Sequence, residues 1–168
     1  MIPLINPDNT CCFTGHRPNK LPWAFNEEDE RCIALKRRIY DIIESVILSG
    51  IRHFMCGMAQ GSDMYFCEQV IELRKKYTYI TIEAAIPCET QSMRWSEWMR
   101  NRYAFLIQQC DYETMLQTAY TPDCMIKRNK YMVNNSSVLI AVFDGTFGGT
   151  MQTVNYAMKK KREIIQIR

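Results

Sequence analysis

The segment Ser137-Val138-Leu139-Ile140-Ala141-Val142-Phe143 is followed without a break by Asp144-Gly145-Thr146-Phe147-Gly148-Gly149-Thr150. The first half is apolar after its opening serine, which is typical of a strand in a parallel sheet that helices cover on both faces. The second half is rich in glycine and leads into a helical stretch that ends in the basic run 159–162. A buried strand, a glycine-rich turn and a helix in this order indicate an α/β fold.

The same alternation of short strand-like runs and longer periodic stretches extends outward through the chain. Strands are predicted at residues 10–14, 53–56, 79–86, 137–143 and 163–167, with a weaker one at 111–117. Between them, apolar residues recur with helical spacing. We therefore expect a Rossmann-like three-layer α/β/α sandwich with a mostly parallel sheet, formed by a single domain over residues 1–168.

Composition sets limits on the class of protein. The chain has 168 residues, of which 47% are hydrophobic and 23% charged, which excludes disordered, collagen-like and mucin-like proteins. There are 21 lysines and arginines against 18 acidic residues, so the formal net charge is +3. This surplus is far below that of a dedicated nucleic-acid-binding protein.

Neither a membrane segment nor a secretion signal is predicted. The longest apolar runs are much shorter than the ~20 residues needed to cross a bilayer, and the first seven residues are interrupted by proline. The eight cysteines include no Cys-x-x-Cys pair, and His16 and His53 do not have the spacing of a zinc site. We expect a cytoplasmic protein with reduced, buried thiols and no metal.

Capping residues predict where three helices begin. Asn26 is suited to cap the first helix, with acidic residues in the turn that follows. Ser62 or Asp63 can cap the second. Thr121 followed by Pro122 predicts the start of the fourth helix, with threonine as the cap and proline at the first helical position.

The loop after the first strand, Thr14-Gly15-His16-Arg17-Pro18, lies where ligands bind in open parallel sheets, beyond the carboxyl ends of the strands. Its hydroxyl, imidazole and guanidinium are groups that hold phosphate or carboxylate oxygens. The same residues also fit a tight turn in which Gly15 has a positive φ and Arg17 is a solvated charge. The location at a strand end favours ligand contact.

The loop after the second strand, Gly57-x-x-x-Gly61-Ser62-Asp63, lets the backbone approach a phosphate closely. A carboxylate repels phosphate, so Asp63 is expected to hold a ribose hydroxyl or to serve as a negative charge at a helix N-terminus. A purely structural role for the loop is an equal alternative.

The glycine-rich loop Asp144 to Thr150 is the strongest indication of a binding site. Here Gly145, Gly148 and Gly149 precede a helix, and amides at a helix N-terminus form an anion site. The loop lacks both the lysine of a phosphate-binding NTPase loop and the Gly-x-Gly-x-x-Gly pattern of dinucleotide dehydrogenases. Neither ATP hydrolysis nor hydride transfer is therefore implied.

The basic run Lys127-Arg128-Asn129-Lys130 falls inside a predicted helix. It forms either a solvated face or, through Arg128 and Asn129, part of the binding cleft. A separate aromatic cluster lies in the predicted helix 92–109, where tryptophans alternate with arginines. Such a stripe either stacks nucleic-acid bases or belongs to the core or to a dimer face.

These loops, in this order, resemble those of the YpsA-like branch of the SLOG superfamily, Rossmann-like proteins grouped with the DNA-processing protein A and the Lonely Guy enzymes. The matching stretches span nearly the whole chain: residues 14–18 with Leu21, 57–63, Ala85-Ile86-Pro87, Trp95, 120–132 and 144–150. The resemblance implies a bound nucleotide or nucleotide-derived ligand, such as NAD, ADP-ribose or an AMP-like molecule, and a role in bacterial signalling or regulation.

Lonely Guy enzymes cleave the N-glycosidic bond of nucleoside monophosphates with an arginine and with a glutamate that lies just after a Gly-Gly-x-Gly-Thr loop. Here Thr150 is followed by Met151, Gln152 and Thr153, so the carboxylate that stabilises an oxocarbenium-like transition state is absent. If the chain is an enzyme, we expect a nucleotide N-glycosidase that uses another group. The candidates for a catalytic role are Asp63, Asp144 and Arg128.

The sequence is therefore consistent with three functions. The leading one is a nucleotide-binding sensor, the second is the N-glycosidic hydrolase, and the third is a single-stranded DNA-binding protein. A homodimer through the tryptophan-bearing helix is a further expectation. The residues predicted to bind the ligand are Thr14, Gly15, His16, Arg17, Gly57, Gly61, Asp63, Arg128, Asn129, Asp144, Gly145, Gly148, Gly149 and Thr150.

Overall fold

Within the part of the chain that the structure describes, six strands form one sheet in which every neighbouring pair is parallel. The computed structural model describes residues 4–168, and the sheet has the order β4-β3-β2-β1-β5-β6. The strands are β1 (Thr10–Gly15), β2 (His53–Cys56), β3 (Thr81–Ile86), β4 (Tyr112–Met115), β5 (Val138–Val142) and β6 (Glu163–Ile167). The prediction of a mostly parallel sheet is confirmed, and the sheet proves to be parallel throughout.

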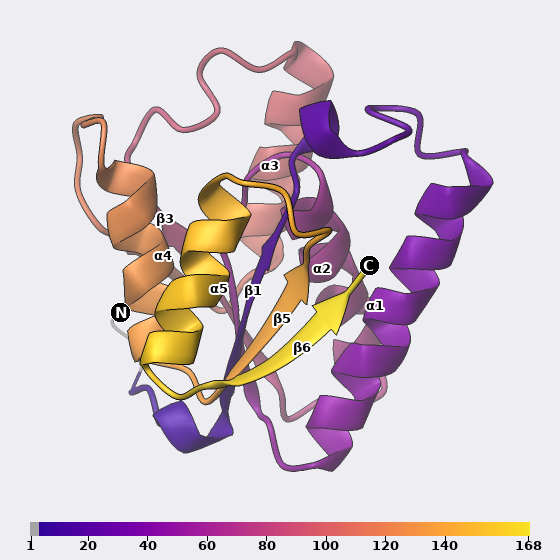
Figure 1. Ribbon diagram of the computed structural model, residues 1–168, viewed down its shortest axis with the longest axis vertical. Helices are drawn as coiled ribbons and strands as arrows, with labels where there is room; N and C mark the ends of the chain where they lie inside the picture. Colours follow the sequence, from indigo (N-terminus) through magenta and orange to yellow (C-terminus); the bar gives the residue numbers. More distant parts are fainter. Residues whose placement is uncertain (1–3) are drawn as a thin grey trace.

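Among residues 4–168, five α-helices complete a three-layer sandwich, as predicted. They are α1 (Glu30–Leu48), α2 (Ser62–Arg74), α3 (Glu97–Gln109), α4 (Cys124–Asn134) and α5 (Gly149–Lys159), and two short 3-10 helices cover Pro7–Asn9 and Pro18–Lys20. Helices α4 and α5 lie side by side on one face of the sheet, and α1, α2 and α3 pack on the other (Figure 1).

The two sheet faces divide the buried residues into two cores. In β1, Cys11 and Phe13 pack into the core below α1 and α2, whereas Cys12 packs into the core below α4 and α5. In β5, Ile140 faces the first core and Leu139 the second. Because side chains alternate along a strand, a strand covered on both faces has no polar side. This explains the unbroken apolar run of β5.

The first helix begins later than the sequence predicts. The side chain of Asp29 caps α1 by accepting a hydrogen bond of 2.8 Å from the Arg31 amide. Asn26 instead accepts from the Glu28 amide at 3.3 Å, inside the turns that precede α1. Asparagine and aspartate both cap helices well, and the prediction of Asn26 as the cap of α1 is wrong.

The other predicted caps are also displaced. Asp123 is the N-cap residue of α4, and Thr121 donates a hydrogen bond of 2.7 Å to its carboxylate. Gly61 occupies the N-cap position of α2, with Ser62 already inside the helix. The tryptophan-bearing helix α3 begins after the Ser96 cap, so its first residue lies five positions beyond the predicted start at residue 92.

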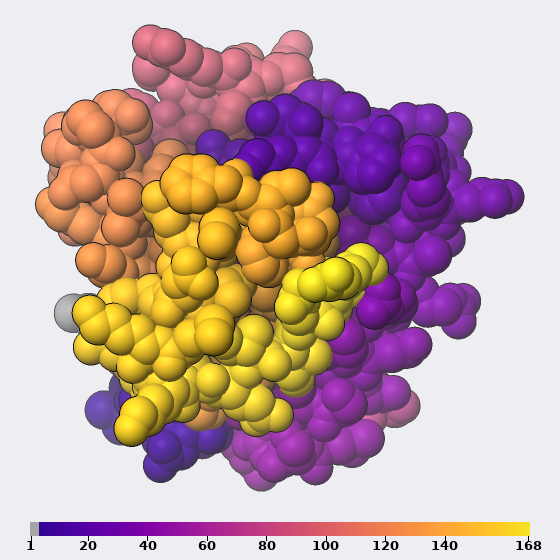
Figure 2. Space-filling model, viewed as in Figure 1, coloured from indigo at the N-terminus to yellow at the C-terminus, as the bar shows by residue number. Residues whose placement is uncertain are grey.

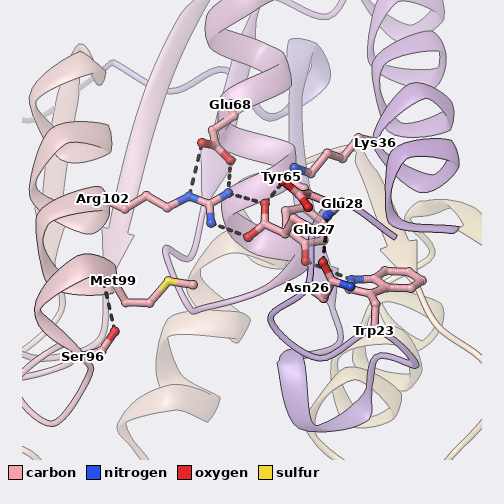
Figure 3. Close-up of polar contacts among 10 residues, drawn as sticks. All are labelled: Trp23, Asn26, Glu27, Glu28, Lys36, Tyr65, Glu68, Ser96, Met99 and Arg102. Carbon is pink, nitrogen blue, oxygen red and sulfur yellow. Dashed lines mark hydrogen bonds and ion pairs between the residues drawn. The ribbon is translucent and has the colours of Figure 1, made fainter. Parts of the chain in front are cut away.

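A half-buried arginine joins α3 to the rest of its layer. Arg102 donates hydrogen bonds to Glu27, at 2.5 and 2.9 Å, and to Glu68, at 2.6 and 3.3 Å (Figure 3). Lys36 of α1 also donates to Glu27 at 2.7 Å. The network connects α1, the segment before it, α2 and α3. The charge of Arg102 is therefore neutralised by glutamates within the fold.

The strand order reverses between β1 and β5, because the chain continues from β1 through β2, β3 and β4 on one side and returns to add β5 and β6 on the other. Gly15 pairs with Val142, so both strands end at the same level. This reversal is where open α/β sheets bind ligands. Within residues 4–168, no helix combines the length and apolar character of a membrane span.

Candidate functional site

A cavity of about 250 Å³ opens beyond the carboxyl end of β1, at the reversal in strand order. Its walls come from the end of β1 and the segment after it, the beginning of α2, the inner side of α4 and the first turn of α5. The lining residues predicted from the sequence are Thr14, Gly15, His16, Arg17, Asp63, Arg128, Asn129, Gly149 and Thr150. The fold therefore gathers these nine side chains and backbones around one space.

Arg128 is the most deeply placed cation of this cavity. Only 3% of its surface is exposed, and its guanidinium donates to the Gly57 carbonyl and, at 3.4 Å, to the Ala85 carbonyl. Its Nε donates to Asn129 Oδ1 at 2.9 Å. Among residues 4–168, no carboxylate oxygen lies within 4 Å of Arg128. Burial lowers the pKa of Arg128, but an arginine remains charged in proteins.

Among the described residues, Asp63 is the one acidic residue on the cavity wall. Its Oδ2 accepts a hydrogen bond of 3.1 Å from the Ala59 amide. Burial raises the pKa of this carboxyl, and the positive charge of Arg128 partly offsets that effect. The side chain does not cap α2, and it faces the cavity from the first turn of the helix.

Two predicted glycines lie behind the wall instead of on it. A Cβ at Gly57 would stand 2.9 Å from the Arg128 Cζ and 3.0 Å from Asp63 Oδ2. Gly61 has a φ of +88°, and a Cβ there would lie 2.9 Å from the His16 carbonyl oxygen. These glycines allow the groups of the site to approach one another, which is the structural alternative for this loop.

Gly15 also serves close packing. Its φ is not positive, in contrast to the tight-turn alternative, and a Cβ would lie 2.3 Å from Ser62 Oγ. Ser62 in turn donates a hydrogen bond of 2.7 Å to the His16 carbonyl. The segment after β1 is thereby held against the start of α2, which fixes the direction of His16 and Arg17.

The glycine-rich loop lies at the rim of the cavity. Asp144 is outside the cavity wall and accepts a hydrogen bond from the Thr146 amide at 3.0 Å, and its Oδ1 lies 2.9 Å from His16 Nε2. Gly145 and Gly148, with φ values of +92° and +154°, turn the chain toward α5 without lining the cavity. Figure 2 shows this orange segment against the indigo segment that follows β1.

Sequence reasoning missed Lys20 and Asn19, which line the cavity from the segment after β1. Lys20 donates a hydrogen bond of 2.8 Å to the Phe147 carbonyl, and a Cβ at Gly148 would lie 2.3 Å from its Nζ. Their only signal is their position a few residues beyond the first loop. Gln152, one turn into α5, also lines the cavity.

The charges around the cavity favour an anion. Arg17, Lys20 and Arg128 contribute three positive charges, against the single carboxylate of Asp63. Helix α5 starts at Gly149 with no side-chain cap from the described part of the chain, so its first amides can bind a ligand. Within residues 4–168, no group of three His, Cys, Asp or Glu side chains is arranged to hold a metal ion.

Comparisons with known proteins agree with this architecture. The chain is 29% identical over 140 residues to the uncharacterized SPbeta prophage-derived protein YoqJ of Bacillus subtilis, which covers 76% of this chain and 82% of that protein. Among solved structures, DNA processing protein A (DprA) of Streptococcus pneumoniae has a TM-score of 0.64 at 13% identity, covering 95% of this chain and 50% of that one.

DprA of Helicobacter pylori, solved to describe its single-stranded DNA binding mode, has a TM-score of 0.62 at 15% identity and covers 95% of this chain and 65% of that one. This chain thus spans about half to two thirds of the two DprA chains, and the likeness establishes a shared fold. The model of the YspA SLOG family matches residues 11–167, nearly the full length. The protein therefore belongs to the YspA SLOG family, and the relationship predicted from the order of its loops is confirmed.

Proposed function

We propose that the cavity at the ends of β1 and β5 binds the phosphate of a nucleotide or nucleotide-derived ligand. The observation that carries the proposal is Arg128, a buried cation on the cavity wall with no carboxylate within 4 Å in the described chain. A buried charge is costly unless a partner neutralises it. A phosphate is the partner that both the guanidinium and the free amides of α5 accept.

In this proposal, different groups of the site bind different parts of the ligand. Arg17, Lys20 and Arg128 neutralise the phosphate, and the amides of Gly149 and Thr150 donate to its oxygens. Asp63 is suited to hold a ribose hydroxyl, because its carboxylate repels phosphate but accepts from O–H. NAD, ADP-ribose and AMP share these features, and the protein would act as a sensor of such a molecule.

Isothermal titration calorimetry with AMP, ADP-ribose, NAD and adenosine tests the proposal. We expect at least one of the three phosphate-bearing ligands to bind with one-to-one stoichiometry. We also expect adenosine to bind at least tenfold more weakly than AMP. Equal affinity for AMP and adenosine, or no binding in the whole series, would contradict it.

Asp63 supports a second candidate function, hydrolysis of an N-glycosidic bond. Its carboxyl lies on the cavity wall near Arg128, and burial raises its pKa, which suits a group that exchanges protons. Asp144, the other candidate, lies outside the wall. Chromatography of the products distinguishes the two functions, since an enzyme releases the free base and a sensor returns the ligand intact.

A role in binding single-stranded DNA, as in the H. pylori neighbour, has less support in this chain. Of the aromatic cluster, Trp98 is 63% exposed, but Trp95 packs edge-on against Tyr103 with ring centroids 5.3 Å apart. Arg102 is committed to two glutamates. DNA binding would weaken steeply with salt, typically over a range of about 50 to 200 mM. An affinity for a single-stranded oligonucleotide that does not change over this range would exclude this function.

A cytoplasmic location agrees with the state of the cysteines. All eight are free, and seven of them are buried, with Cys110 half-buried. Such thiols suit a reducing compartment, where nucleotides are also abundant.

A further inference from the structure

A second cavity, of about 350 Å³, lies on the other side of the segment that follows β1. It is bounded by α1, by the ends of β5 and β6, and by residues 21–23. Its walls are largely apolar, with Trp23, Leu35 and Phe143 among them and Ala34 at the exposed side of α1. The proposed function makes no use of this space.

His16 and Lys20 line both cavities and so form the ridge between them. The ridge is held from the loop after β5, because His16 contacts Asp144 at 2.9 Å and Lys20 donates to the Phe147 carbonyl at 2.8 Å. Lys20 is exposed, so a ligand can lie across the ridge on its solvent side. The two spaces are therefore neighbours on one surface of the molecule.

The walls of the two cavities have complementary chemistry. The first presents cations and helix amides, which suit phosphate oxygens. The second exposes mainly apolar surface, including the rings of Trp23 and Phe143, although Arg31, Arg38, Asp144 and Arg168 also line it. The apolar part suits a flat ring. The indole of Trp23 is held in place by a hydrogen bond of 3.1 Å from its Nε1 to the Tyr65 hydroxyl, so it does not have to be ordered by the ligand.

We propose that the second cavity holds the base of the nucleotide whose phosphate occupies the first, with the sugar lying across His16 and Lys20. This inference rests on the proposed function, which assigns groups to the phosphate and to a ribose hydroxyl but none to the base. It assigns the ligand to the class of intact nucleotides, with a heteroaromatic ring, and excludes sugar phosphates and inorganic phosphate as equal ligands.

The test compares AMP with ribose 5-phosphate in calorimetric titrations of the wild type, Ala34→Phe and Ala104→Phe. Ala34 is exposed and lines the second cavity, so phenylalanine fills that space from the surface of α1. Ala104 is an exposed alanine of α3 that lines neither cavity, and it is the matched control. Circular dichroism verifies that each variant is folded.

The proposal predicts that the wild type and Ala104→Phe bind AMP at least tenfold more tightly than ribose 5-phosphate. Ala34→Phe abolishes this preference and leaves the affinity for ribose 5-phosphate within twofold of the wild type. If AMP and ribose 5-phosphate bind equally well to the wild type, the base site is wrong and the phosphate site stands. If neither binds, both proposals fail.

Tryptophan fluorescence gives a second measurement that does not depend on Ala34→Phe folding. In the double variant Trp95→Phe, Trp98→Phe, the only remaining tryptophan is Trp23. AMP should then change the emission in a saturable way, and ribose 5-phosphate should not. An emission that AMP leaves unchanged, although calorimetry shows that it binds, would overturn the proposal.

Discussion

The Nε2 atom of His16 lies 2.9 Å from Oδ1 of Asp144, which joins the segments that leave the two strands flanking the reversal in strand order. The residues are 128 positions apart in the chain. Asp144 also accepts hydrogen bonds from the Thr146 amide and hydroxyl. One carboxylate therefore shapes the glycine-rich loop and fastens it to the segment after β1.

Removing this carboxylate should loosen the loop. Hydrogen bonds from Thr146, aided by His16, hold the pKa of Asp144 well below its usual value. Its contribution is therefore present above the ordinary aspartate pKa and is lost only as the pH falls below it. In Asp144→Ala, we expect faster hydrogen exchange of the Thr146 amide at pH 6 to 7. Exchange equal to that of the wild type would show that the loop is fastened by other contacts.

The glycines of the site should differ sharply when changed to alanine. Gly61→Ala meets the backbone of the segment after β1 at a φ of +88°, so we expect a loss of about 2 kcal/mol in the free energy of unfolding. A Cβ at Gly149 meets nothing within 4 Å, and its φ is not positive. Urea denaturation measures the free energy of unfolding of Gly61→Ala and Gly149→Ala, and equal values for the two variants would contradict this prediction.

Arg102 should matter for stability and not for ligand binding. In Arg102→Met, Glu27 and Glu68 lose their shared partner, and we expect a loss of about 2 kcal/mol in the free energy of unfolding. Burial disfavours the ionised form of Glu27, but the bonds from Arg102 and Lys36 outweigh it and lower its pKa. The stabilisation is therefore present above the ordinary glutamate pKa and lost on acidification. Denaturation of the wild type and Arg102→Met at pH 7 and pH 3 tests the effect on stability. A nucleotide titration of the variant tests whether ligand binding is unchanged.

Asp63→Asn separates binding from hydrolysis. The substitution removes the carboxylate that the proposal assigns to a ribose hydroxyl, so affinity for AMP should fall by about tenfold, the value of one hydrogen bond to a charged group. If the protein is also a hydrolase that uses Asp63, release of the base stops in the same variant. Affinity equal to that of the wild type, without any effect on hydrolysis, would contradict both roles given to Asp63. Glu89→Gln, which changes an exposed carboxylate away from the cavity, is the control.

The fold was predictable because its signals are local. Strands β2 and β6 have the predicted bounds, and the apolar run of β5 reports burial on both faces. The helix starts were less predictable, since Asn26 and Asp29 are both good caps and the turns between them decide which one is used. Sequence alone contains no measure of that competition.

The loops around the candidate site were predictable, but its geometry was not. That Arg128 projects from α4 to the carbonyls of Gly57 and Ala85 depends on how α4 packs over the sheet. The pairing of Arg102 with Glu27 joins residues 75 positions apart. Lys20 was missed for the same reason, because its contact with Phe147 arises only when two distant loops meet.

The most direct test of the central claim is calorimetric titration of AMP into the wild type, Arg128→Met and Lys127→Met. Lys127 is an exposed neighbour on α4 that lies 3.5 Å from Asp123 and does not line the cavity, so it controls for the loss of one charge. We predict that Arg128→Met, once shown to be folded, loses about 30-fold or more in affinity, the value of a charged hydrogen bond, while Lys127→Met stays within about twofold of the wild type. Equal affinities of a folded Arg128→Met and the wild type would contradict the account.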